Sequence, residues 1–154
     1  MYLRTKTLLC VRIGQIALLI FILMFLLSAY VAHASALSEQ VVQSLTTAIA
    51  VVRWNCMFIV VFGLSVMFSQ PSQDTANLYS RYVNIVCVSM GLVFISSLLF
   101  ALPIGLKYLL DYPALAFITP YSTLFFVFGY LGFIVAMGIR FTYYTRLTGQ
   151  PNND

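Results

Sequence analysis

Four long, continuous apolar stretches fill most of this 154-residue sequence and constrain its fold more than any other feature. An α-helix needs about 20 predominantly apolar residues to cross the hydrocarbon core of a bilayer. Transmembrane β-strands would instead show segments of about ten residues with alternating polarity. The sequence therefore predicts an all-α, polytopic integral membrane protein, with four transmembrane helices in a small bundle. The predicted spans are 13–32, 45–68, 82–102 and 121–139.

The composition agrees with lipid as the main solvent. Hydrophobic residues make up 62% of the chain and charged residues 8%, whereas a soluble domain normally carries about 25% charged residues. The length predicts a single transmembrane domain over 1–154, without room for a separate soluble module. The net charge of +4 comes from scattered basic residues at span ends, so we expect the lipid bilayer, and not a nucleic acid, as the partner of these charges.

Arg53 is the most conspicuous residue in the second span. A helix starting after Arg53 would cover only 54–68, about 22 Å, which is too short for a core about 30 Å thick. The helix should therefore begin before Arg53, leaving this residue about two turns inside. Glu39 and Asp111 fall on the same predicted side and are candidate ion-pair partners. The alternatives are a side chain that reaches the headgroups and a ligand contact.

Proline and glycine set the expected ends of the last two spans. Pro103 and Gly105 should break the third span, so that 103–119 forms a half-apolar connection. The dipeptide Thr119-Pro120 suits a helix start, with Thr as N-cap and Pro in the first helical position. The polar segment 149–154 reads as a disordered tail.

Polar and small residues mark the faces where helices should meet. Asn84 shares a predicted face with Cys87 and Gly91, and an Asn inside a span usually joins helices by hydrogen bonding. Small residues let helix backbones approach closely. The positions expected at helix–helix contacts are Gly63, Gly91, Gly129, Gly132 and Ala136.

Basic residues predict the orientation. With four spans both termini share a side, and basic residues are enriched on the cytoplasmic side. That side would hold Arg4, Lys6, Arg12, Arg81, Arg140 and Arg146, against Lys107 and Arg53 on the other. We therefore expect both termini in the cytoplasm, in a bacterial inner membrane or its equivalent. The segment 1–34 also resembles a cleavable signal peptide, although its apolar run is longer than the usual 7–15 residues.

Catalytic and metal-binding patterns are missing from the spans. His33 is the single histidine, and Cys10, Cys56 and Cys87 form no C-x-x-C pair, so we predict no metal, cofactor or disulfide framework. All four acidic residues fall outside the predicted spans.

Three hypotheses about function follow from this pattern. The first is a non-enzymatic subunit or accessory protein of a larger membrane complex, such as a secretion or conjugation apparatus. The second is a small transporter, channel or carrier of a lipid-like ligand, which would need to oligomerise and would use Arg53 as the ligand contact. The third is a membrane enzyme that uses an outer group of charged residues, namely Glu39, Arg53, Lys107 and Asp111.

Overall fold

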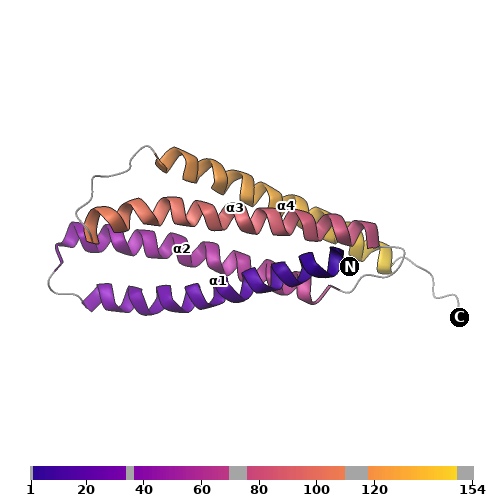
Figure 1. Ribbon diagram of the computed structural model, residues 1–154, viewed down its shortest axis with the longest axis horizontal. Coiled ribbons are helices and arrows are strands. Elements are labelled where there is room, and N and C mark those ends of the chain that lie inside the picture. The colour runs from indigo at the N-terminus through magenta and orange to yellow at the C-terminus, as the bar shows by residue number, and fades with distance from the viewer. Residues whose placement is uncertain (1, 34–36, 70–75, 110–117, 149–154) are drawn as a thin grey trace, which may run out of the picture.

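The computed structural model is a bundle of four long α-helices arranged side by side (Figure 1). The structure describes residues 2–33, 37–69, 76–109 and 118–148, and these ranges contain no strand. The helices are α1 (Tyr2–His33), α2 (Glu39–Met67), α3 (Ala76–Leu109) and α4 (Thr119–Thr148). Each is long and apolar enough to cross a membrane. The predicted all-α membrane fold is confirmed. The predicted tail 149–154 lies outside the described residues.

The third helix does not end where the sequence predicted. Pro103 lies inside α3, which continues to Leu109, so the expectation that Pro103 and Gly105 break the helix is wrong. Proline removes one backbone donor and crowds the carbonyl four residues earlier, yet a membrane helix tolerates it because neighbouring groups can satisfy the freed carbonyl. Helix α4 begins at Thr119, next to the predicted start.

The second helix begins earlier than predicted, which changes the depth of Arg53. Because α2 runs from Glu39 to Met67, Arg53 lies 14 residues from each end (53 − 39 and 67 − 53). At 1.5 Å per residue that is about 21 Å. Arg53 is therefore at the midpoint of its helix and not two turns from its start.

The helices pack as two antiparallel pairs that meet along α2 and α3. Helix α1 packs most extensively on α2, and α4 on α3. Glycines bring each pair together. A Cβ atom on Gly63 would lie 3.2 Å from the Cα of Gly14 in α1, and a Cβ on Gly129 would lie 3.2 Å from the backbone nitrogen of Val93 in α3. Contacts of this length are tighter than most that Cβ atoms make, so glycine favours the close approach in both pairs.

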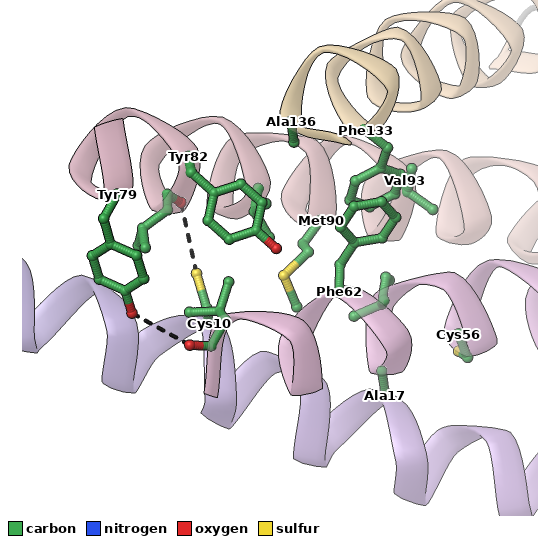
Figure 2. Close-up of a cluster of buried hydrophobic side chains, with 14 of the residues drawn as sticks. Cys10, Ala17, Cys56, Phe62, Tyr79, Tyr82, Met90, Val93, Phe133 and Ala136 are labelled. Carbon is green, nitrogen blue, oxygen red and sulfur yellow. Dashed lines mark hydrogen bonds between the residues drawn. The ribbon is translucent and has the colours of Figure 1, made fainter. Parts of the chain in front are cut away.

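The core lies where the two pairs meet. Ile59 of α2 and Val86 and Met90 of α3 are fully buried. Figure 2 shows the rings of Phe62 and Phe133 facing each other, and their centroids are 4.1 Å apart with nearly parallel planes. The helices also expose many large apolar side chains on their outer faces, as suits helices surrounded by lipid.

The two ends of the bundle are named by the helix ends that lie there. Helix α1 begins and α4 ends at the same end (Figure 1), which we call the terminal end, and the opposite end the far end. Cys10 of α1 points toward α3 near the terminal end, with its Sγ 3.9 Å from the carbonyl oxygen of Val83 (Figure 2). Helix α1 begins and α4 ends at the same end because the bundle has an even number of antiparallel helices.

Candidate functional site

A buried polar cluster joins three helices near the middle of the bundle. Asn55 of α2 is 1% exposed. Its Nδ2 donates to Ser97 Oγ of α3 at 2.8 Å, and its Oδ1 accepts from the Tyr130 hydroxyl of α4 at 3.1 Å. The Ser97 hydroxyl in turn donates to the carbonyl oxygen of Val93. We call Asn55, Ser97 and Tyr130 the central cluster; it is uncharged.

A second polar cluster joins the same three helices nearer the terminal end. The Ser65 hydroxyl of α2 hydrogen-bonds the Tyr82 hydroxyl of α3 and accepts a hydrogen bond from Nη1 of Arg140 in α4. Nη2 of Arg140 donates to the Tyr144 hydroxyl at 3.2 Å, and the guanidinium carbon lies 5.4 Å from the centre of the Tyr144 ring. We call Ser65, Tyr82, Arg140 and Tyr144 the terminal cluster; it carries a positive charge.

The terminal cluster borders a groove between α2 and α4. Helix α4 packs its backbone on α3 and reaches α2 through side chains such as Phe133 and Tyr130. The space left between them, which we call the α2–α4 groove, has a volume of about 520 Å³. Its lining comprises Met57, Phe58, Val61, Phe62 and Ser65 from α2 and Met137, Arg140, Phe141 and Tyr144 from α4.

A second cavity, of about 430 Å³, lies between α1, α2 and α3 toward the far end. Its walls are almost entirely apolar, with Met24, Ile49 and Phe94 among the lining residues. Polar groups are few there, so this cavity lacks the combination of apolar walls and convergent polar groups that orients a ligand. The α2–α4 groove has that combination.

Two of the charged residues singled out in the sequence, Arg53 and Glu39, do not come together. Arg53 is half-buried and lines neither of these two cavities. Glu39 is exposed at the first residue of α2. The two lie 14 residues apart in one continuous helix, about 21 Å, so the expected pairing of Arg53 with Glu39 is wrong. Asp111 lies outside the described residues.

Asn84 joins two helices at the terminal end. Its Oδ1 accepts a hydrogen bond from Nζ of Lys6 at 2.6 Å, which links α3 to α1. The predicted face with Cys87 and Gly91 is only half-buried. Asn84 therefore joins helices by hydrogen bonding, and its partner is a charged residue of the first helix.

The predicted small residues differ in what surrounds them. Gly63 lies against α1, as described above, and Gly129 and Gly132 of α4 lie against Ser89 of α3. Ala136 is fully buried. Gly91 is the exception, because a Cβ at this position would meet no other atom within 4 Å. Its neighbours Met90 and Val93 face the core instead.

The residues that carry both clusters were not the ones that the sequence singled out. Asn55 stands two positions from Arg53, and an uncharged amide is a weaker sequence signal than an arginine inside a span. Tyr130 lies inside the predicted span 121–139, and a tyrosine hydroxyl buried there needs a hydrogen-bond partner, which is a usable signal. Arg140 follows the last residue of the predicted fourth span and was counted as an orientation charge. Nothing in a single sequence shows that it faces Ser65.

Metal sites would require clustered ligands. Within the described ranges no group of three or more His, Cys, Asp or Glu side chains comes together, and the three cysteines are free thiols.

No known family model matches the chain, and neither a curated protein nor a solved structure is significantly similar to it. Its function must therefore be argued from its own residues.

Proposed function

We propose that this protein is a non-enzymatic subunit of a larger membrane assembly, and that it acts through what its helices bind. One observation carries the proposal. In the described part of the chain, every buried side-chain nitrogen and oxygen has a hydrogen-bond partner, and these partners are other helices or the same helix. The interior polar groups thus hold the bundle together, because unsatisfied polar groups are costly in a membrane.

The outer surface supports the same proposal. The glycines of closest approach are used inside the two helix pairs, so a partner would meet large apolar side chains instead, such as Phe128 and Ile134 on α4. Helix association in a membrane relies on packing and hydrogen bonds because lipid tails are as apolar as the helices. A secretion or conjugation apparatus is one kind of assembly that such a subunit would serve.

The orientation proposed for this subunit places both termini in the cytoplasm of a bacterial inner membrane or an equivalent membrane. The basic residues Lys6, Arg12, Arg81 and Arg140 support it, because they lie in the parts of α1, α3 and α4 nearest the terminal end. Basic residues are enriched on the cytoplasmic side. The variants Arg81→Cys and Lys107→Cys, labelled with a membrane-impermeant maleimide, test this proposal. The cysteine at position 107 should react from outside, and the cysteine at position 81 should not.

The assembly itself is tested by extraction in a mild detergent or in native lipid particles, followed by gel filtration and mass spectrometry. The proposal predicts that the same partner polypeptides accompany the 17.3 kDa chain in independent preparations. Recovery of the chain only as a lone monomer under both extraction conditions would contradict it.

The second candidate, a carrier of a lipid-like ligand, is favoured by the α2–α4 groove and not by Arg53. An enzyme that uses the outer charged group has less support, because Glu39 and Arg53 are held far apart by one helix. Replacing Arg53 by alanine should leave binding of a lipid-like ligand unchanged in folded protein.

A further inference from the structure

The α2–α4 groove combines an apolar channel with a guanidinium at its terminal end. We propose that it binds an anionic phospholipid of the surrounding bilayer, with the headgroup phosphate at Arg140 and an acyl chain along the groove. This inference concerns the groove alone and stands whether or not a partner protein binds elsewhere on the bundle.

The apolar part of the groove suits an acyl chain. Met57 and Val61 of α2 and Met137 and Phe141 of α4 line it and are exposed on the outer surface of the bundle, so the groove opens sideways. Flexible methionines adapt to irregular apolar partners. The volume of about 520 Å³ falls within the range of about 300–1,000 Å³ typical of ligand sites. In a membrane, the molecules that face such an opening are lipids.

The charge of the groove favours an anionic headgroup. The described hydrogen-bond partners of Arg140 are the neutral hydroxyls of Ser65 and Tyr144, so these contacts leave its positive charge in place. A guanidinium has five donors in a planar fork that matches the geometry of phosphate. These two hydrogen bonds occupy one donor on each terminal nitrogen, and their hydroxyl partners hold the fork at the groove.

The depth of Arg140 also fits a headgroup. Arg140 lies 20 residues after Pro120, the first residue of the apolar span of α4 (140 − 120). That separation is about 30 Å, close to the thickness of the hydrocarbon core. An arginine at one boundary, beside an apolar groove between helices, resembles the basic pockets that bind lipid headgroups between transmembrane helices.

The test measures which lipids the full-length protein retains. The protein is placed in nanodiscs with equal amounts of phosphatidylglycerol and phosphatidylcholine, released into mild detergent, and analysed by native mass spectrometry. The wild-type chain should retain phosphatidylglycerol in preference to phosphatidylcholine. Arg140→Gln should lower this ratio about five-fold, as expected for the loss of one basic contact.

Two further variants complete the test. Arg81→Gln removes an exposed positive charge at the same end of the bundle but outside the groove, and should leave the ratio unchanged. Val61→Trp keeps Arg140 and fills the groove, and should lower retention of both lipids. Circular dichroism and a single gel-filtration peak establish that each variant is folded. The proposal is overturned if Arg140→Gln keeps the wild-type ratio, if Arg81→Gln lowers it equally, or if Val61→Trp retains lipid as the wild type does.

Discussion

The central and terminal clusters join the same three helices with similar side chains, yet only one of them offers a binding site. Each takes one side chain from α2 and one from α3. Helix α4 adds Tyr130 to the central cluster, and Arg140 and Tyr144 to the terminal cluster. In the central cluster Asn55 is almost completely buried. In the terminal cluster Arg140 is half-buried and borders the α2–α4 groove.

The difference follows from depth and charge. A neutral amide can be satisfied by two hydroxyls in mid-membrane, where hydrogen bonds between helices are the main polar interactions available. An arginine keeps its charge, and charge in the hydrocarbon is costly, so it suits the boundary where lipid phosphates lie. We conclude that the central cluster is structural and that the terminal cluster combines packing with recognition.

The largest loss of stability is expected from a substitution that disturbs both clusters together, because both require α4 to lie close against α3. In Gly129→Leu the new side chain would meet Val93, whose Cγ2 lies 2.6 Å from the added Cβ position, and also the backbone of α3. Overpacking of this kind costs about 1–3 kcal/mol, and backbone neighbours place this variant at the upper end.

Gly138→Leu is the matched control for this variant. Gly138 lies in the same helix, is exposed, and has no other atom within 4 Å of an added Cβ. Unfolding measured by steric trapping in bicelles should show a loss for Gly129→Leu and little change for Gly138→Leu. Equal effects of the two variants would contradict the described α3–α4 contact.

The central cluster alone is tested by Asn55→Leu. This variant removes the hydrogen bonds to Ser97 and Tyr130 and leaves the Tyr130 hydroxyl without that acceptor. Interhelical hydrogen bonds in membranes average about 0.6 kcal/mol and reach about 1.7, so a loss of about 1–2 kcal/mol in the free energy of unfolding is expected. Native mass spectrometry of Asn55→Leu should show no change in the ratio of retained phosphatidylglycerol to phosphatidylcholine. A fall in that ratio would show that the two clusters are not separable.

Removal of a hydrogen-bonding side chain from the terminal cluster should lower the free energy of unfolding less than it does in the central cluster. Ser65→Ala removes the hydroxyl shared by Tyr82 and Arg140, but Arg140 is half-buried at the membrane boundary, where its guanidinium can find another acceptor. A loss of about 0.6 kcal/mol is expected. If Ser65→Ala destabilised the bundle as much as Asn55→Leu does, the distinction between a structural and a binding cluster would not hold.

The smallest effect is expected at Arg53, outside both clusters. Among the described residues its side chain has no ion pair or hydrogen bond. Arg53→Gln should therefore change the free energy of unfolding by no more than about 0.5 kcal/mol. A loss above 1 kcal/mol in the same unfolding assay would place Arg53 in an interaction that this account lacks.

The sequence was sufficient for the four spans and insufficient for the pairings between them. Runs of apolar residues report the need to cross the bilayer, so α1 to α4 could be predicted from length and polarity. Pro103 does not end α3, because tertiary packing and the membrane favour a continuous helix over the local tendency of proline to break one.

The site was harder to predict because it depends on helix register. Arg53 lies at the midpoint of α2, and not near its start, because α2 begins at Glu39. Asn55 meets Tyr130 and Ser65 meets Arg140 only because α2 and α4 lie in one particular relative position. A single sequence fixes which residues share a face of one helix, but not which face of another helix they meet.

The claim that α2 and α4 are joined through the middle of the membrane is tested most directly by a double-mutant cycle between Asn55 and Tyr130. The free energies of unfolding of Asn55→Ala, Tyr130→Phe and the double variant are compared with that of the wild type. A coupling energy of about 0.6–1.7 kcal/mol is predicted for a direct interhelical hydrogen bond. Additivity within about 0.3 kcal/mol would contradict it.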